Sequence, residues 1–514
     1  QKLDVHARTR ETGSSMRHSR SSYHCHAAMF VAALRLSLRP SVSIRSRSAS
    51  KHVRSLFRSQ CSSRLHSSVS PSSRLSTGPK HIHNHRQPET VPKSVYIHLP
   101  FCVQRCYYCD FAITTVGSSG TAFSPHSPTV ISRFEKYVHA LLDEINHTLD
   151  GMSMTSTKRS CLTSIYIGGG TPSLVPARFL SMVLELLDRR LGICSDTEIT
   201  IEMDPNTFDE TVANEFKLLG MNRVSIGAQS FDDALLESCG RIHRASDIYC
   251  AVDALGRVGI ENVSLDLISA LPYQSVQQWK HSLQQVIQLA PKHVSTYDLE
   301  LHESTKFGKL YTPGVSPLPS SDDAADMYEL AVTALNAHGI MHYETSNYAQ
   351  RGYESQHNQT YWKNEPYFAF GMSAASYVNN KRVKRPSTLS QYYDWVTQHA
   401  FTNGTPQETP LSAQDELEET VMLGLRLVRG IDLEELECRF RGRFGGETDS
   451  VAERLVRASK EYLETGILLL ECDPITDRRH LKLSDPRGFL IQNTVLRDLF
   501  LGLESLNEPN RIDE

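Results

Sequence analysis

Short runs of β-branched and aromatic residues alternate with longer amphipathic stretches from residue 93 onward. Such runs predict strands at residues 94–100, 164–170, 198–205, 223–230, 262–268 and 293–301. Between them lie segments of helical periodicity, and those at 176–192 and 209–220 end at a glycine, as helices often do. Six strand–helix units in succession predict an α/β fold with a parallel sheet. Right-handed crossovers would curl this sheet into a full or partial (β/α)6 barrel.

Unusual polar residues lie at or near the carboxyl ends of these predicted strands. They are Cys102, Gly168 to Thr171, Glu202, Gln229, Asp266, Tyr297 and Glu300. In barrel enzymes the chemistry takes place at the carboxyl ends of the parallel strands. We therefore expect six separate segments to contribute to one site.

Three cysteines lie close together in the stretch YIHLPFCVQRCYYCDF, with the spacing CxxxCxxC: Cys102, Cys106 and Cys109. Thiolates bind iron–sulfur clusters, zinc or copper, and a [4Fe–4S] cluster normally takes four of them. Three thiolates would leave the fourth iron open to another ligand. A zinc site needs a fourth protein ligand, for which His98 or Asp110 is available, but no second CxxC or HxxxH pair follows. The spacing favours a cluster, with zinc as the alternative.

The composition limits the class of protein. The 514 residues are enough for one large domain and a smaller one, and 11 cysteines are too few for a secreted disulfide scaffold. This pattern favours a reducing compartment and a metal site over disulfides. No run of eighteen apolar residues occurs, so the sequence predicts no membrane span.

Charge is distributed very unevenly along the chain. Residues 1–88 carry 16 Lys and Arg against 2 Asp and Glu, whereas the rest carries 38 against 56. An acidic body disfavours a nucleic-acid partner. From Met29 the basic segment is rich in Arg, Ser and Leu, which is typical of a mitochondrial transit peptide in a disordered region. The alternatives are a plain basic tail, another organelle or the cytoplasm, and we interpret the KHIHNHR tract (80–86) as linker rather than as a metal site.

The cysteine motif and the GGGTP stretch resemble the radical S-adenosylmethionine (SAM) superfamily. A narrower resemblance rests on SVYIHLPFC, YIGGGTPS, EMDPNTF, RVSIGAQSF, LDLISALPYQ, YETSNYA, HNQTYW and LGLRLVRGID. Together these segments resemble the oxygen-independent coproporphyrinogen oxidase-like family, which includes HemN oxidases and HemW haem chaperones. The resemblance implies a radical SAM partial barrel over 93–340, an extension over 341–400 and a mostly helical C-terminal domain over 411–505.

The resemblance also implies the cofactors. Cys102, Cys106 and Cys109 would hold a [4Fe–4S] cluster whose fourth iron binds SAM. The residues implied to contact SAM are Tyr96, Tyr108, Gly169, Gly170, Thr171, Glu202, Gln229, Arg241 and Asp266. These roles agree with the chemistry of the side chains. A carboxylate accepts hydrogen bonds from an amine or from ribose hydroxyls, and Arg can donate two parallel hydrogen bonds to a carboxylate.

Two features distinguish the branches of this family. The oxidase type carries a cysteine two positions after the third cluster cysteine, whereas this chain has Phe111, as the chaperone type usually does. HNQTYW resembles the haem-binding HNxxYW motif, with His357 as the expected axial ligand and Tyr361 and Trp362 on the porphyrin face. Without the resemblance, this segment would be interpreted as a loop with a capped His and a buried aromatic pair.

The sequence therefore predicts a mitochondrial haem chaperone that passes haem to acceptor proteins, for example of the respiratory chain, and that needs an electron donor. The runner-up is an oxidase that decarboxylates coproporphyrinogen, and a third reading is a zinc-stabilised binding module. The chain departs from the family at AFGMSAAS, where Ala369, Met372, Ser373 and Ala375 replace Gly, Pro, Gly and His. It departs again at SALPYQ, where Tyr273 replaces Gly.

Overall fold

The computed structural model describes residues 91–117, 127–152, 161–401, 411–444 and 450–505. The basic segment 1–88, with its expected transit peptide and the KHIHNHR tract, lies outside the described residues. Within the described part of the chain, no helix has the length and apolar character that crossing a membrane requires.

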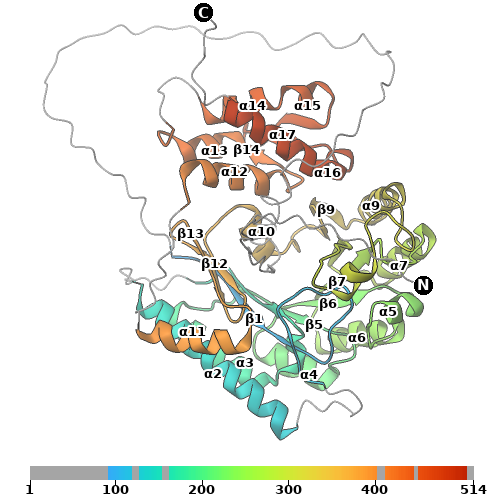
Figure 1. Cartoon of the computed structure of the whole chain (residues 1–514), viewed down its shortest axis with the longest axis vertical. Coiled ribbons are helices and arrows are strands. Elements are labelled where there is room, and N and C mark those ends of the chain that lie inside the picture. The colour runs from blue at the N-terminus through green and yellow to red at the C-terminus, as the bar shows by residue number, and fades with distance from the viewer. Residues whose placement is uncertain (1–90, 118–126, 153–160, 402–410, 445–449, 506–514) are drawn as a thin grey trace, which may run out of the picture.

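A nine-stranded sheet forms the centre of the molecule (Figure 1). All six predicted strands are present, and they lie side by side and parallel, in chain order: β1 (Ser94–Leu99), β4 (Ser164–Gly169), β5 (Glu198–Met203), β6 (Arg223–Gln229), β7 (Asn262–Ser269) and β8 (His293–Asp298). The sheet order runs from β11 to β9, and among the described residues these two edge strands do not pair with each other. The predicted partial (β/α)6 barrel is therefore confirmed.

Three short strands extend this sheet beyond the predicted six. β11 (Phe368–Phe370) runs parallel to β1, although it lies far downstream in the sequence. At the other edge β10 (Asn347–Ala349) runs antiparallel to β8 and to β9 (Met341–Glu344). Residues of the 341–400 region thus extend both edges of the barrel sheet.

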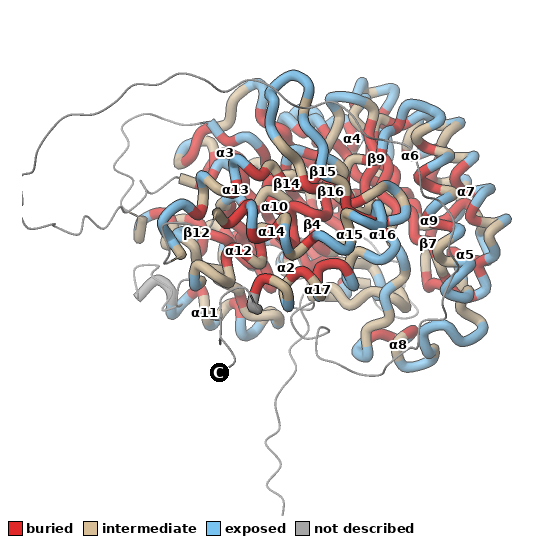
Figure 2. The backbone as a smooth tube through the Cα atoms, turned by 90° about the horizontal axis from the view of Figure 1, so that it is seen from above, coloured by how far each residue is buried: buried red, intermediate tan, exposed pale blue. Residues whose placement is uncertain are grey.

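Helices cover the outer face of the sheet. They are α2 (Pro128–Asp150), α3 (Ala177–Arg190), α4 (Glu210–Leu218), α5 (Asp233–Ser238), α6 (Ala245–Val258), α7 (Val276–Leu289) and α9 (Ser321–Asn336). Several begin at a side chain that accepts a backbone N–H of the first turn, including Ser127, Asp209 and Ser275. Every residue of β1 and β4 is buried, as expected for a sheet covered on both faces, and Figure 2 shows this buried centre.

The remaining elements of the barrel part surround its rim and edges. They are β2 (Phe101–Cys102), β3 (Thr114–Thr115), η1 (Pro172–Leu174), α8 (Lys306–Leu310), α10 (Gln356–Trp362), β12 (Ala375–Val378), β13 (Lys381–Lys384) and α11 (Leu389–Phe401).

The C-terminal elements gather at one end of the barrel, above α10 (Figure 1). They are α12 (Ala413–Gly424), β14 (Ile431–Asp432), α13 (Leu433–Phe440), α14 (Val451–Ala458), α15 (Lys460–Glu464), β15 (Leu468–Cys472), β16 (Arg479–Leu483), α16 (Arg487–Leu490) and α17 (Gln492–Ser505). Within this mostly helical region, β15 and β16 form a hairpin, and β14 adds a third strand. A β-bridge from Glu344 to Leu427 joins this region to the sheet.

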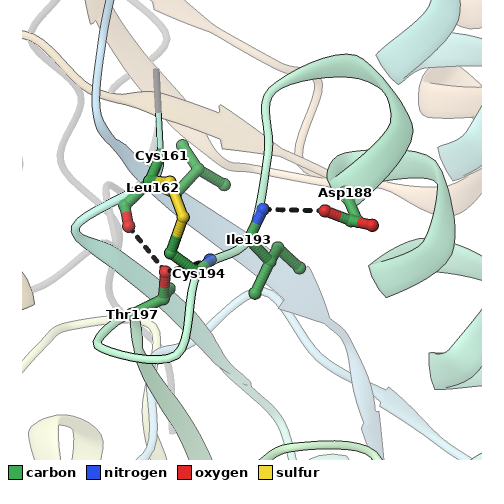
Figure 3. The surroundings of a disulfide bond; sticks show 6 residues. All are labelled: Cys161, Leu162, Asp188, Ile193, Cys194 and Thr197. Carbon is green, nitrogen blue, oxygen red and sulfur yellow. Dashed lines mark hydrogen bonds between the residues drawn. A yellow bond between two sulfur atoms is a disulfide. The ribbon is translucent and has the colours of Figure 1, made fainter. Parts of the chain in front are cut away.

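One pair of cysteines departs from the expectation that the chain avoids disulfides. Cys161 and Cys194 are bonded, with their Cα atoms 5.7 Å apart (Figure 3). The two residues precede the adjacent parallel strands β4 and β5, which brings them within the range that a disulfide requires. Thr197 Oγ1 accepts from the N–H of Cys194 at 3.0 Å and donates to the carbonyl of Leu162 at 2.7 Å. The sequence gives no local sign of this contact, because 33 residues separate the two cysteines.

Candidate functional site

A cavity of about 870 Å³ lies at the carboxyl ends of the parallel strands. As predicted, the segments that end these strands all contribute to its lining, with Cys102, Gly169, Glu202, Gln229, Asp266 and Tyr297. The cavity also reaches the C-terminal region, where Arg426 and residues 489–494 line it. Its volume is near the upper end of the range of about 300–1,000 Å³ for ligand pockets, so it has room for more than one small ligand.

The cysteine loop is held by hydrogen bonds to neighbouring segments. The N–H of Tyr107 donates to the carbonyl of Cys239 at 2.9 Å, and Gln104 Nε2 donates to the carbonyl of Gly240 at 2.8 Å. Within the loop, Arg105 Nη1 donates to the carbonyl of Cys109 at 3.0 Å. The backbone that carries the three thiols is therefore fixed by the fold.

All three cysteines line the cavity, and hydrogen-bond donors contact two of their thiols. Thr171 Oγ1 donates to Cys102 Sγ at 3.5 Å, and Arg241 Nη1 donates to Cys106 Sγ at 3.5 Å. Burial raises the pKa of Cys102, and it raises the pKa of Cys109 to about 11. Thiols in such surroundings stay protonated near neutral pH unless a metal binds them, and metal binding then releases their protons. The donors and the cavity suit a group held by thiolates.

The surroundings of the three thiols bear on the alternative of a single zinc ion. Among the described residues, no group of three His, Cys, Asp or Glu side chains is arranged to hold one metal ion. His98, one of the two suggested fourth zinc ligands, is buried, with Nδ1 3.1 Å from the hydroxyl of Tyr96 and Nε2 3.0 Å from the carbonyl of Ala112. Both of its ring nitrogens are thus engaged away from the thiols. Asp110, the other suggested ligand, lines the cavity beside the cysteines.

The GGGT turn packs directly against the chain that carries Cys102. The N–H of Gly170 donates to the carbonyl of Leu99 at 2.8 Å, and the N–H of Thr171 donates to that of Phe101 at 2.7 Å. A Cβ on Gly170 would lie 2.5 Å from the carbonyl oxygen of Phe101. Gly169 has φ +118°, which a residue with a side chain rarely adopts. These glycines are therefore required for the close approach of the second strand to the cysteine loop.

Glu202 presents a buried carboxyl group to the cavity. Tyr166 donates to its Oε1 at 2.8 Å, and the N–H of Gly169 donates to its Oε2 at 2.9 Å. Burial raises the pKa of Glu202 to about 7 in spite of these two hydrogen bonds, which favour the ionised form. A ligand that brings a positive charge, such as an amine, would restore ionisation.

Asp266 and Arg241 place two further charged groups in the lining. Asp266 accepts from the hydroxyls of Ser225 and Ser264, and burial raises its pKa. Arg241 pairs with Asp204 and donates to the carbonyl of Gly227 at 2.9 Å. Asp204 directly follows β5 (Glu198–Met203), so the rule that placed Glu202 in the site would also have found it.

The two tyrosines expected to contact SAM lie in different places. Tyr108 lines the cavity beside the cysteines. Tyr96 is buried and is not part of the cavity lining; its ring stacks on that of Tyr166, with centroids 6.1 Å apart. Tyr166, which the sequence did not single out, lies in the lining itself.

The HNxxYW segment forms α10, whose residues Tyr361 and Trp362 line the same cavity as the cysteines. His357 is 1% exposed and does not line the cavity. Its Nδ1 lies 2.9 Å from Ser164 Oγ and its Nε2 lies 2.8 Å from the hydroxyl of Tyr361. Burial lowers the pKa of His357 to about 3, so the imidazole is neutral. In this conformation both ring nitrogens are occupied.

Comparisons with known proteins agree with this architecture. Residues 96–286 match the Radical SAM superfamily, and residues 411–471 match the HemN C-terminal domain. Coproporphyrinogen III oxidase (HemN) from Escherichia coli has a similar structure, with a TM-score of 0.63 at 20% identity over 82% of this chain and 92% of that one. This similarity concerns the fold.

Curated relatives extend the similarity along the sequence. Heme chaperone HemW of Synechocystis sp. is 38% identical over 80% of this chain and 98% of its own length, and that of Bacillus subtilis is 33% identical over 73% and 92%. Radical S-adenosyl methionine domain-containing protein 1, mitochondrial, of Bos taurus is 31% identical over 74% of this chain and 82% of its own length. The chain therefore belongs to the HemW family of radical SAM proteins.

Proposed function

We propose that the protein is a haem chaperone, which binds haem together with a SAM-liganded [4Fe–4S] cluster and delivers the haem to acceptor proteins. The observation that carries this proposal is that Tyr361 and Trp362 of the HNxxYW segment line the same cavity as the three cysteines. The name of the relatives, heme chaperone, and the Phe111 that follows the third cysteine support the same reading.

The cluster and SAM would occupy the rim of the barrel. Cys102, Cys106 and Cys109 would hold the cluster, which supplies one electron at a time when an electron donor has reduced it. Glu202 offers a carboxylate to the amino group of SAM, and Asp266 offers one to ribose hydroxyls. The protein would work in mitochondria, as the name of the Bos taurus relative states for that protein. Its haem acceptors would be, for example, proteins of the respiratory chain.

Haem binding through His357 requires a change in α10. A neutral imidazole is a good ligand for haem iron, but Nε2 must first leave the hydroxyl of Tyr361, or Nδ1 must leave Ser164. The rings of Tyr361 and Trp362 would then pack on the porphyrin. We propose that haem loading releases Nε2 of His357 from the hydroxyl of Tyr361.

The test is an anaerobic comparison of the reconstituted wild-type chain, His357→Ala and the triple variant Cys102→Ala/Cys106→Ala/Cys109→Ala. Cys438→Ala, which removes an exposed free cysteine, is the control. Measured quantities are iron and sulfide content, haem uptake, haem transfer to apomyoglobin as a probe acceptor, and coproporphyrinogen turnover with SAM and dithionite. We expect the triple variant to lose iron and sulfide, His357→Ala to lose haem uptake, and the wild type to transfer haem without porphyrinogen turnover.

Other outcomes point elsewhere. Turnover of coproporphyrinogen by the wild type would show that the protein is an oxidase and not a chaperone. If the wild-type protein binds zinc but neither iron nor sulfide, it is a zinc-stabilised binding module. Unchanged haem uptake in His357→Ala would remove this residue as the ligand.

A further inference from the structure

A buried arginine lines the C-terminal wall of the cavity. Arg426 is 1% exposed, and its side chain reaches the first residues of α17. Its Nη1 donates to Gln492 Oε1 at 3.3 Å and its Nη2 donates to Asn493 Oδ1 at 3.2 Å. Both amides also line the cavity, so they orient the guanidinium at the edge of a space large enough for a ligand.

This wall is built into the contact between the barrel and the C-terminal region. The N–H of Thr345 donates to the carbonyl of Arg426 at 3.0 Å, and Thr345 Oγ1 donates to Gln492 Oε1 at 3.2 Å. The bridge between Glu344 and Leu427 continues the same contact. The position of Arg426 is therefore held by backbone pairing and does not depend on side chains alone.

Burial destabilises the charged form of this guanidinium. The carboxylates of Glu344 and Glu300 attract it, yet burial outweighs them and lowers the pKa of Arg426 to about 10. Burial also raises the pKa of Glu344 to about 7, and the carboxyl of Glu344 already accepts from Asn347 Nδ2 and from the N–H of Ser346. A further anion beside Arg426 would thus be stabilised.

One amide side chain in the same lining has an acceptor atom that is not used for hydrogen bonding within the part of the protein that the structure describes. Asn347 is 3% exposed, and among the described residues its Oδ1 has no hydrogen-bond partner. Buried polar atoms normally have a partner in the protein or in a bound molecule. Asn347 Oδ1 can accept a hydrogen bond from water or from a protonated ligand group, which points to a polar molecule at this wall.

The wall also exposes apolar side chains. Leu490 is 37% exposed and Ile491 is 40% exposed, and both line the cavity next to the buried Phe489. Trp362 of α10 belongs to the same lining. Apolar side chains left open beside a buried cation match a ligand that has a large apolar body and a carboxylate at its edge.

We propose that Arg426, oriented by Gln492 and Asn493, binds a propionate of haem, and that Leu490 and Ile491 cover the adjacent edge of the porphyrin. This inference rests on the proposed haem-binding function and assigns a specificity-determining residue to it. Guanidinium–carboxylate pairs can be bidentate, so the contact fixes the orientation of the ligand as well as its affinity.

The test compares haemin with haemin dimethyl ester, in which both propionates are neutral. Each is titrated into the reconstituted full chain and into Arg426→Gln, Arg426→Lys and Arg443→Gln. Arg443 is the matched control, because it lies in the C-terminal region, pairs with Glu416 at 2.8 Å and is not in the cavity lining. Cluster content and thermal unfolding are recorded for every variant, to show that the fold is kept.

We expect the wild type and Arg443→Gln to bind haemin at least tenfold more tightly than the ester. Arg426→Gln should bind haemin and the ester equally, at the affinity of the wild type for the ester, and Arg426→Lys should recover part of the preference. Equal binding of haemin and the ester by the wild type would overturn the proposal without any variant. A preference retained in Arg426→Gln would overturn it too.

The failure of this inference differs from that of the proposed function. If the wild-type chain binds neither haemin nor its ester, both the proposed function and this inference are wrong. A chain that binds the two equally well remains a haem-binding protein, but one that does not use Arg426 to recognise propionates.

Discussion

The hydroxyl of Tyr361 lies 2.8 Å from Nε2 of His357, four residues earlier on the same helix. The residue expected to ligate haem iron is therefore held by a second residue of its own motif. Because Ser164 Oγ occupies the other ring nitrogen, the imidazole is locked in the interior of the barrel.

Replacing Tyr361 by Phe should strengthen haem binding if His357 is the ligand. The change removes the hydrogen bond to Nε2 but keeps the ring, so freeing the imidazole costs about 1 kcal/mol less, which is about a fivefold lower Kd. A haem titration followed in the Soret band measures this. Tyr367→Phe is the control, because it removes a hydroxyl that accepts from Arg382 Nη1 at 3.4 Å and keeps the ring that packs on Tyr361. A weaker Soret response in Tyr361→Phe would contradict the proposed release.

Glu202 should make the metal-free protein less stable as the pH rises. Its pKa is about 7 in the folded chain against 4.5 for an ordinary Glu, so the unfolded chain loses the proton first. The free energy of unfolding then falls between about pH 4.5 and pH 7, by up to about 3 kcal/mol. Urea denaturation at pH 5 and pH 7.5 should show a smaller fall for Glu202→Gln. The exposed Glu185→Gln serves as control and should behave like the wild type.

The same carboxyl group should control SAM binding. Only the ionised form attracts the amino group of SAM, so affinity should rise with pH through about 7 and then level off. Isothermal titration of the reconstituted protein between pH 6 and pH 8 measures this rise. Glu202→Gln should bind more weakly and with a flat profile over this range. A steep profile in that variant would assign the pH dependence to another group.

Gly170→Ala should destabilise the protein and lower its cluster content. The added Cβ would meet backbone atoms of Phe101, including the carbonyl oxygen at 2.5 Å, and a backbone next to Cys102 has little freedom to move. We expect a loss of about 1–3 kcal/mol and reduced iron per chain. Gly256→Ala on α6 is the matched control, because a Cβ there would have nothing within 4 Å. This control should be neutral or stabilising by up to about 1 kcal/mol.

Tyr273→Gly should leave the protein as stable as before or more stable. Tyr273 replaces the glycine usual in the family and has φ +66°, a conformation that costs residues with a side chain about 1–2 kcal/mol. Its side chain is 67% exposed, so little buried area is lost, although glycine makes the unfolded chain more flexible. Thermal unfolding measures the net change. Tyr249→Gly, inside α6, should instead lower the stability by about 1 kcal/mol.

The other departure from the family pattern, at AFGMSAAS, also places a residue with a side chain at a positive φ. Ser373 stands where the family usually has glycine and takes φ +65°. Its N–H donates to the carbonyl of Pro386 at 2.9 Å, so the turn forms without the glycine. The neighbouring N–H of Gly371 donates to Glu144 at 2.8 Å, which holds this loop on α2. The turn therefore forms with Ser373 in place of the glycine.

Local patterns determined much of this protein from the sequence alone. The alternation of strands and helices predicted the six parallel strands, because burial on both faces and short crossovers leave few other arrangements. The position of polar residues at strand ends predicted that Cys102, Glu202 and Asp266 would share one cavity. These inferences need only the periodicity of the apolar residues and the common direction of parallel strands.

Contacts between distant segments were decided only by the tertiary structure. His357 lies beside Ser164, 193 residues away, and Arg426 reaches the cavity because a bridge joins Glu344 to Leu427. No periodicity encodes such contacts, since they depend on how the C-terminal region packs on an edge of the barrel sheet. For the same reason the sequence could not show that Tyr96 and His357, which the family resemblance assigns to SAM and haem, are buried in this conformation and lie outside the cavity lining.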